Sequence, residues 1–267
     1  MKNETDKFIT KKLFRKRENL NKVNYIIEHS DITYDMIYRA AIIANKNPYH
    51  NFGHMLGFTE SAIMILIAEG AERKEINRVA MSGLTHDAGH EGRVRVYDEI
   101  RSFELTSLVY DEDDLKIMGM TKDQAMAAAR DDIFATIFGN RGKINDRFAR
   151  VMQDADLAHL GRGAMYWLWA SMGLVDEFAA EGRIFSPTQF IYEEQPKFIS
   201  FLKTRSQNND KVYLSEGAQN VFVNPEESLR TLVTFKPAAI EYAYNVRRED
   251  IILDEFKTEV ERLNAIA

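Results

Sequence analysis

The sequence of 267 residues contains no cysteine and only five prolines. Without cysteine, disulfide bonds, zinc–thiolate sites and thiol nucleophiles are excluded, so any metal site must use histidine, aspartate or glutamate. With so little proline and only 14 glycines, a collagen-like or low-complexity chain is also excluded. The remaining composition, 45% hydrophobic and 28% charged residues, is typical of a globular protein with a sizeable core.

Long apolar runs and an excess of basic residues are missing as well. The longest apolar stretch, residues 61–68, is far shorter than the roughly 20 residues that span a bilayer. The first 21 residues are polar and hold no signal-peptide core, so we expect a cytoplasmic protein with no membrane role. Lys plus Arg is 35 against 41 for Asp plus Glu, and this acidic balance argues against general nucleic-acid binding.

Apolar residues recur at three- and four-residue spacings along most of the chain up to residue 205, which predicts an all-α fold. Helices are expected over residues 31–46, 48–70, 74–87, 103–110, 121–138, 146–160, 164–180, 196–203 and 247–267. Weak alternation over 212–223 predicts a short strand. We expect an N-terminal arm at 1–30, a helical domain at 31–205, and a C-terminal extension at 206–267, irregular or strand-containing, packed on that domain.

Five of the six histidines fall in three short clusters with aspartates. The clusters are His50 with His54, then His86 with Asp87 and His90, then Asp156 with His159. Residues three or four apart on a helix share a face, so the members of each cluster are expected to point into one space. Imidazole and carboxylate bind zinc, iron or manganese when thiolate is absent. Two metal ions that share a carboxylate would explain the adjacent histidine and aspartate of the second cluster.

These clusters lie in three segments that together resemble a known family. The segments read Asn-Pro-Tyr-His-Asn-Phe-Gly-His at 47–54, Thr-His-Asp-Ala-Gly-His-Glu-Gly at 85–92, and Ala-Asp-Leu-Ala at 155–158. They resemble the HD superfamily of metal-dependent phosphohydrolases, and within it the 3′,5′-cyclic nucleotide phosphodiesterases. That family carries Pro-Tyr-His-Asn-x-x-His, His-Asp-x-Asp-His-Pro-Gly and Ala-Asp-Leu-Ser segments in this order on a helical bundle. The likeness covers about residues 45–201.

The resemblance implies two divalent metal ions, which can be Zn, Mn, Mg or Fe. It assigns four ligands to the first metal: His54, His86, Asp87 and Asp156. Asp87 would also bridge to the second metal, and His90 would hydrogen-bond the water shell of that metal. His50 would donate a proton to the leaving oxygen. Gly89 stands where the family usually has aspartate, which puts the surroundings of the second metal in question.

Further positions extend the likeness. The segment Ser-Phe-Glu-Leu at 102–105 looks like the family's Ser-Glu-Leu, and this implies that Glu104 steers the general acid. The segment Gln-Pro-Lys-Phe-Ile at 195–199 looks like the family's Gln-x-x-Phe-Ile, in which the amide reads the base and the ring stacks on it. We therefore expect four residues at the substrate: Tyr49, His159, Gln195 and Phe198.

Together, these implications favour a metal-dependent phosphodiesterase that hydrolyses a cyclic mononucleotide or a cyclic oligonucleotide with a metal-bound hydroxide. One alternative is a generic HD nucleotide phosphohydrolase, such as a nucleotidase or a deoxynucleotide triphosphohydrolase. The other is a regulatory metal-binding module with weak catalysis. The expected partner is a small-molecule nucleotide, and the apolar share of residues 247–263 leaves two roles open, pairing in a homodimer or docking on the chain's own core.

Overall fold

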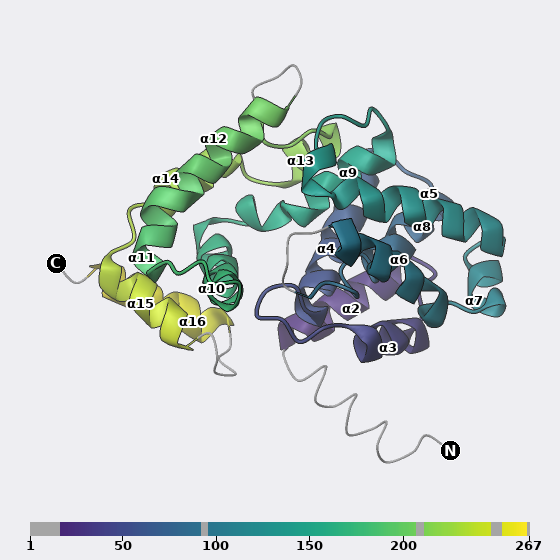
Figure 1. The fold of residues 1–267 in the computed structure, drawn as a ribbon, viewed down its shortest axis with the longest axis horizontal. Helices are drawn as coiled ribbons and strands as arrows, with labels where there is room; N and C mark the ends of the chain where they lie inside the picture. Colours follow the sequence, from purple (N-terminus) through teal and green to yellow (C-terminus); the bar gives the residue numbers. More distant parts are fainter. Residues whose placement is uncertain (1–16, 92–95, 207–210, 247–252, 266–267) are drawn as a thin grey trace, which may run out of the picture.

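The computed structural model describes residues 17–91, 96–206, 211–246 and 253–265, and these ranges are helical (Figure 1). The only strand-like pairing in them is one isolated antiparallel bridge between Lys46 and Asn51. The predicted all-α fold is therefore confirmed. The N-terminal arm and the C-terminal helix are described only from Arg17 and from Leu253 onward, so part of each expectation lies outside the described residues.

The helices follow one another with short connections. In order they are α2 (Arg17–His29), α3 (Tyr34–Ile43), α4 (Phe52–Ala68), α5 (Arg73–Gly83), α6 (Val96–Val109), α7 (Glu112–Ile117), α8 (Lys122–Thr136), α9 (Arg147–Asp156), α10 (Ala164–Ala180), α11 (Pro187–Gln189), α12 (Gln195–Arg205), α13 (Glu216–Val221), α14 (Pro225–Leu232), α15 (Pro237–Val246) and α16 (Leu253–Ala265). Short 3-10 turns occupy Phe138–Asn140 and Ala158–Leu160, and a π-helical turn occupies Phe190–Glu194.

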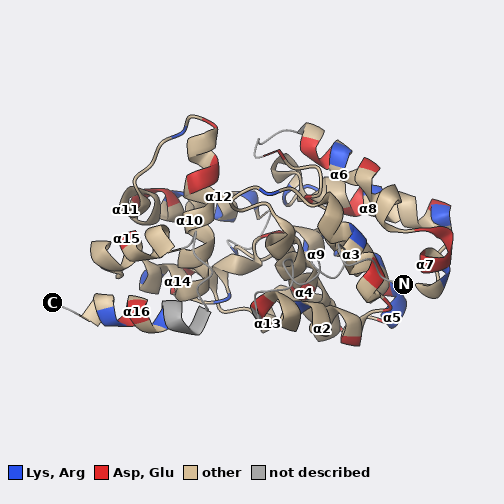
Figure 2. Cartoon of the chain, turned by 90° about the horizontal axis from the view of Figure 1, so that it is seen from below, with Lys and Arg blue, Asp and Glu red and all other residues tan. Residues whose placement is uncertain are grey.

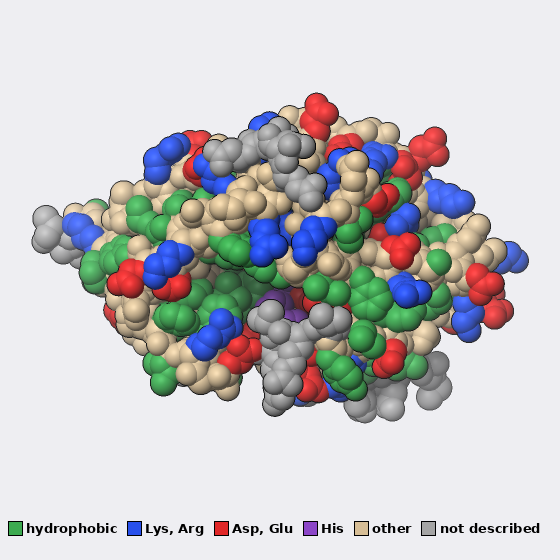
Figure 3. Space-filling model, turned by 45° about the horizontal axis from the view of Figure 1, so that its top comes forward, with side chains coloured by type: hydrophobic (Ala, Val, Ile, Leu, Met, Phe, Trp, Pro, Cys, Tyr) green, Lys and Arg blue, Asp and Glu red, His purple; other side chains and the backbone are tan. Residues whose placement is uncertain are grey.

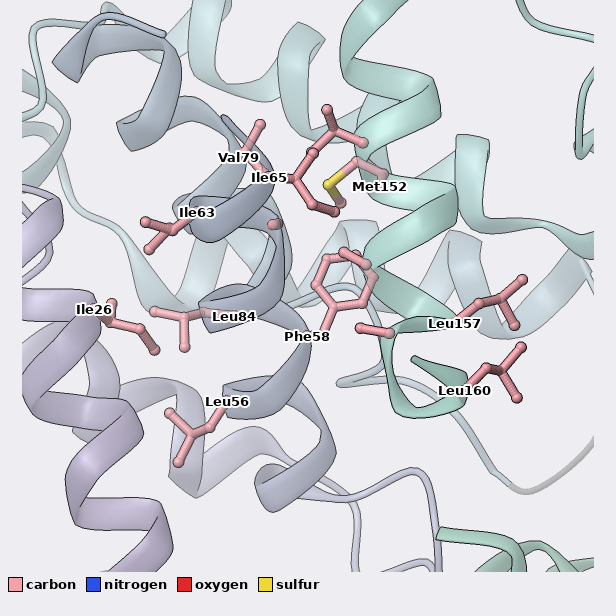
Figure 4. Packing of buried hydrophobic residues seen from close by; sticks show 14 of the residues in the cluster. Ile26, Leu56, Phe58, Ile63, Ile65, Val79, Leu84, Met152, Leu157 and Leu160 are labelled. Carbon is pink, nitrogen blue, oxygen red and sulfur yellow. The ribbon is translucent and has the colours of Figure 1, made fainter. Parts of the chain in front are cut away.

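Helix α4 forms the centre of the N-terminal half, where α2, α5, α9 and α13 pack around it. Its sequence is apolar on nearly every side, so it must be surrounded by other helices rather than exposed on one face. Figure 4 shows Leu56, Phe58, Ile63 and Ile65 of this helix packed against residues from its neighbours. This core fixes the N-terminal end of α4, at which the first histidine cluster lies.

The second half of the molecule is built on α10, against which α14 and α15 pack (Figure 1). Helix α16 packs on α15, and its Val260 is fully buried. The chain returns to the first half through α13, which packs on α4 and α9. Residues after 205 therefore contact both halves of the molecule.

The strand expected over residues 212–223 is wrong. The backbone N–H groups of Leu214 and Ser215 donate to the buried carboxylate of Asp154, at 2.8 and 2.7 Å, and not to a neighbouring strand. The Ser215 hydroxyl then caps α13 by accepting from the N–H of Ala218. The carboxylate of Asp154 thus accepts the backbone hydrogen bonds that a neighbouring strand would otherwise accept.

Several helices also end earlier or begin later than the apolar spacing predicts. Helix α4 begins at Phe52 and not at Pro48, because the side chain of Asn51 accepts from the N–H groups of Gly53 and His54. Helix α5 ends at Gly83 rather than near Asp87. The residues between these ends and the expected ones lie in turns, where several of the candidate site residues are found.

None of the helices in the described ranges is long and apolar enough to cross a membrane. Acidic and basic side chains are interspersed along α7 and α16 (Figure 2). Along these two helices, charges of both signs therefore occur together.

Candidate metal centre and active site

Four side chains from three parts of the chain converge beneath a hollow between the two halves, at whose floor Figure 3 shows histidine. Helix α4 supplies His54, the turn after α5 supplies His86 and Asp87, and the last turn of α9 supplies Asp156. Each offers one ligand atom, and these atoms all lie within 4.8 Å of one another. Two imidazoles and two carboxylates at this spacing can hold a divalent cation.

Burial within this group supports that assignment. The Nε2 atoms of His54 and His86 and the Oδ2 atom of Asp87 are buried and have no hydrogen-bond partner. The two nitrogens nevertheless lie only 3.1 and 3.0 Å from that same oxygen. Buried polar atoms without partners are costly, and a shared cation would satisfy all three at once. The residues present therefore fit a divalent metal ion.

The surroundings of His86 hold its ring in a fixed orientation. Its Nδ1–H donates to the carbonyl oxygen of Gly83 at 2.8 Å, and its ring stacks on Phe58 with centroids 3.7 Å apart. This hydrogen bond fixes the tautomer and leaves Nε2 as the atom that points at Asp87. Metal-binding histidines commonly have such a partner on the other ring nitrogen.

The electrostatics of the centre show how strongly it attracts positive charge. Burial lowers the pKa of His54, but the adjacent carboxylates of Asp156 and Asp87 outweigh burial and raise that pKa to about 10. The pKa of Asp87 is held well below its usual range, because neighbouring imidazoles outweigh the effect of burial. Without a metal, the two carboxylates therefore keep a proton on His54, and a divalent cation would displace that proton.

A second group lies beside the first and consists of His50, His90 and Glu177. The Nδ1–H of His50 donates to Oε1 of Glu177 at 2.5 Å, and the rings of His50 and His90 stack with centroids 3.8 Å apart. The other oxygen of Glu177 accepts from the backbone N–H groups of Tyr49 and His50, at 3.0 and 3.2 Å. Glu177 thus holds both the ring and the backbone of His50.

Sequence reasoning missed Glu177, which lies on α10 and is separated from His50 by 127 positions. One signal was present, because Glu177 shares a helix face with buried Ala170 and Gly173. A carboxylate on an otherwise apolar helix face must find a partner inside the protein. That signal indicates a buried acid but cannot name its partner.

The two stacked histidines differ in their preferred protonation. For His50, burial lowers the pKa, but the carboxylates of Asp87 and Glu177 outweigh burial and raise it. For His90, burial and the neighbouring charge of His50 lower the pKa. The pair therefore favours a protonated His50 next to a neutral His90, as a proton donor beside a ligand or acceptor would require.

Tyr49 and His159 are both buried and share a hydrogen bond of 3.0 Å between the Tyr49 hydroxyl and Nδ1 of His159. The ring of Tyr49 packs against those of His50 and His54, with centroids 4.8 and 4.7 Å apart. Burial, together with the charge of His54, lowers the pKa of His159 to about 4. Tyr49 and His159 therefore form a buried, hydrogen-bonded pair that packs beside His50 and His54.

Three further residues that we expected at the site have neighbours outside the histidine clusters or an exposed side chain. Glu104 lies on the exposed side of α6. The side chain of Gln195 is buried, and its Oε1 accepts from Nε1–H of Trp167 at 2.7 Å. Phe198 stacks on Phe138 with centroids 5.8 Å apart. Gln195 thus has a hydrogen-bond partner inside the protein and lies directly after the π-helical turn Phe190–Glu194.

The expected reason for the histidine grouping also needs correction. His50 lies in the bend before α4, and His86 and His90 lie in the turn after α5, so neither pair shares a helix face. The rings of His50 and His54 nevertheless have centroids only 5.5 Å apart. The clusters meet because turns direct the side chains inward.

Comparison with known proteins adds little to this geometry. No protein-family model and no curated protein matches the sequence. Among solved structures, the chain is similar to the phosphodiesterase domain of the RhoPDE fusion protein from the choanoflagellate Salpingoeca rosetta, with 16% identity and a TM-score of 0.48. The likeness covers 92% of this chain and 91% of that one. At this level of similarity it assigns no role to any residue, and the arrangement of side chains described above must carry the functional argument.

Proposed function

We propose that the protein is a metal-dependent phosphohydrolase of the HD superfamily and that it hydrolyses the phosphodiester of a cyclic nucleotide. One observation carries the proposal: a buried four-ligand cation centre lies beside a histidine whose other ring nitrogen is held by a carboxylate. Such a pair of groups supplies what phosphoester hydrolysis requires, namely an activated water and a proton for the leaving oxygen. The three sequence segments support the assignment to this superfamily.

In this proposal, His54, His86, Asp87 and Asp156 hold the cation. When bound, a divalent cation supplies a nucleophile and charge neutralisation, because it lowers the pKa of water toward about 7 and polarises a phosphate oxygen. The two carboxylates give the centre its affinity for positive charge. The hydrogen bond from His86 to Gly83 and the stacking on Phe58 keep one ligand in place before the cation arrives.

His50 is the proposed proton donor. Because its Nδ1–H is bound to Glu177, Nε2 is the atom that can give a proton to the departing oxygen of the substrate. Glu177 does not touch the substrate in this proposal and acts as a positioning residue. It fixes the tautomer of His50 and raises the pKa that makes His50 a donor.

The hydrolysis of a linear nucleotide is the second candidate. Its support is the position of Gln195, which is buried and whose amide oxygen already accepts from Trp167, so that fewer of its polar groups remain to read a base. The residues that hold a cation and a proton would serve the hydrolysis of either substrate equally well. An assay with both kinds of nucleotide therefore decides between the two candidates.

A panel of phosphoesters with added Mn²⁺ tests both candidates. It would contain cyclic AMP, cyclic GMP, cyclic dinucleotides, nucleoside monophosphates and deoxynucleoside triphosphates, with products separated by chromatography. We expect ring opening of a cyclic nucleotide to a linear nucleotide. Release of phosphate or triphosphate from a linear nucleotide would move the protein to the second candidate. Bound metal without any turnover would refute catalysis and leave a regulatory metal-binding module.

A further inference from the structure

Helix α6 is held tightly against the turn that carries His86, Asp87 and His90. The N–H of Gly89 donates to Oγ of Ser102 at 2.9 Å, and Oγ1 of Thr85 shares a hydrogen bond of 2.9 Å with Oγ1 of Thr106. A Cβ atom on Gly89 would lie only 2.6 Å from the backbone nitrogen of Ser102. A residue with a side chain at position 89 would therefore push α6 away.

The same face of α6 carries an acidic residue one turn before Ser102. Asp98, Ser102 and Thr106 are spaced by four residues, and all three are buried. Asp98 is only 5% exposed, and its Oδ2 atom has no hydrogen-bond partner. The contacts that hold α6 against the turn thus also bring the buried carboxylate of Asp98 close to His90.

The distance between Asp98 and His90 indicates what lies between them. Oδ2 of Asp98 is 3.9 Å from Nε2 of His90. This separation is too long for a hydrogen bond, for which about 2.7–3.2 Å is normal. Two ligand atoms on one cation, each at about 2.0–2.2 Å from it, lie roughly 3 to 4.3 Å apart. The spacing therefore suits a shared cation.

The charge around this position supports the same conclusion. Glu99, next to Asp98 on α6, also has a buried carboxylate oxygen, Oε2, without a partner. Two adjacent residues of α6 thus each have a buried carboxylate oxygen without a partner, and a cation at this position would satisfy such oxygens.

We propose that Asp98, through Oδ2, and His90, through Nε2, are direct ligands of a second divalent cation beside the four-residue centre. The proposal deepens the proposed function and rests on it for the first cation. It differs from what the family resemblance implies, in which His90 reaches the second cation only through water. In this chain, the carboxylate missing at Gly89 is replaced by one from α6, which can approach because position 89 has no side chain.

Binding of Mn²⁺ alone tests the proposal without any substrate. Equilibrium dialysis with elemental analysis would give the number of ions bound by the full chain, and electron paramagnetic resonance would show whether two ions are spin-coupled. We expect two ions and a coupled signal for the unaltered protein. For Asp98→Asn, which keeps the shape of the side chain, we expect one tightly bound ion and loss of at least about 100-fold in affinity for the second.

Two variants complete the design. His90→Gln should lose the second ion in the same way, and Asp113→Asn should bind two ions, because Asp113 is exposed on α7. Binding of a single ion by the unaltered protein would overturn the proposal whatever the variants do. So would two ions of unchanged affinity in Asp98→Asn. If two ions bind as expected but none of the phosphoesters is cleaved, the proposed function fails and the second site stands.

Discussion

The two histidine groups at the floor of the hollow contain similar residues but differ in what their polar atoms face. In the four-ligand centre, two imidazole nitrogens each lie about 3 Å from one carboxylate oxygen, and none of these three atoms has a hydrogen-bond partner. In the neighbouring group, Nδ1–H of His50 donates to Glu177 at 2.5 Å, and the same glutamate accepts two backbone N–H groups. Both groups lie within the spacing that a metal ion allows.

This difference indicates separate tasks for the four-ligand centre and for the pair of His50 and Glu177. Buried atoms without a hydrogen-bond partner gain most from a cation. A hydrogen-bonded imidazole gains less from a cation and is better suited to hold a proton. We therefore expect changes in the first group to affect metal binding and turnover together, and changes at His50 or Glu177 to affect turnover alone.

The largest effect is expected from Asp87→Ala. This carboxylate lies 3.1 and 3.0 Å from the two histidine nitrogens, so its loss removes the negative charge between them. Bound Mn²⁺, measured by elemental analysis after dialysis, should be lost, and phosphoester hydrolysis should fall to background. A variant that keeps both its metal and its turnover would contradict the assignment of the centre. Asp113→Asn, on the exposed surface of α7, is the matched control.

His50→Gln should separate the two tasks. We expect metal content to stay unchanged and turnover on nucleotides to fall by about 10²–10⁴-fold, the usual contribution of a general acid. A substrate with a p-nitrophenolate leaving group needs little protonation, so its hydrolysis should fall much less. His29→Gln is the control, because His29 bonds to the carbonyl of Tyr25 on α2 and lies outside both groups. Equal losses on both substrates would argue against a proton-donor role.

Glu177→Gln should have a smaller effect of the same kind. The amide keeps the shape of the side chain but removes the charge that, together with that of Asp87, raises the pKa of His50. We expect a loss of about 10–100-fold in kcat on nucleotides, the range found for residues that orient a functional histidine, with unchanged metal content. The kcat and the Mn²⁺ content, measured on one preparation, show whether Glu177 orients His50 or binds the cation. A loss of metal would place Glu177 in the cation site instead.

Gly89→Ala tests the segment that joins the two groups. Its Cβ would meet the backbone of Ser102 at 2.6 Å, and such overpacking usually costs about 1–3 kcal/mol of unfolding free energy. Gly139→Ala is the matched control, because nothing lies within 4 Å of a Cβ there. Urea unfolding of the two variants measures the difference. Equal stability would show that α6 can move away from the turn at little cost.

The sequence predicts the members of the four-ligand centre but not the reason they meet. Short spacings single out three clusters, the family resemblance selects His54, His86, Asp87 and Asp156 from them, and the structure brings the ligand atoms of these four within 4.8 Å. The helix-face argument for these spacings is wrong, since the capping side chain of Asn51 starts α4 after His50. Local propensity cannot show this, because the competition between a cap and one more helical turn is decided by tertiary packing.

The residues that sequence reasoning missed are those that tertiary packing brings to their partners. Glu177 meets His50 across 127 positions, and Asp98 reaches His90 only because Gly89 lets α6 approach. Neither relation leaves a periodic pattern in the sequence. The helical core, by contrast, follows from periodic apolar residues, and for α10 the predicted and observed bounds agree, Ala164–Ala180.

The smallest effect is expected from Glu104→Gln, for which the family resemblance and the structure predict different results. The resemblance makes Glu104 steer the general acid, whereas the structure places it on the exposed side of α6, with the buried Asp98, Ser102 and Thr106 on the opposite face. A change of less than about twofold in kcat and in Mn²⁺ binding is therefore expected, as for other exposed positions. A loss of tenfold or more would mean that α6 turns its other face to the site in solution. In that case Asp98 and His90 would no longer lie together, and the proposed second cation site would fail with them.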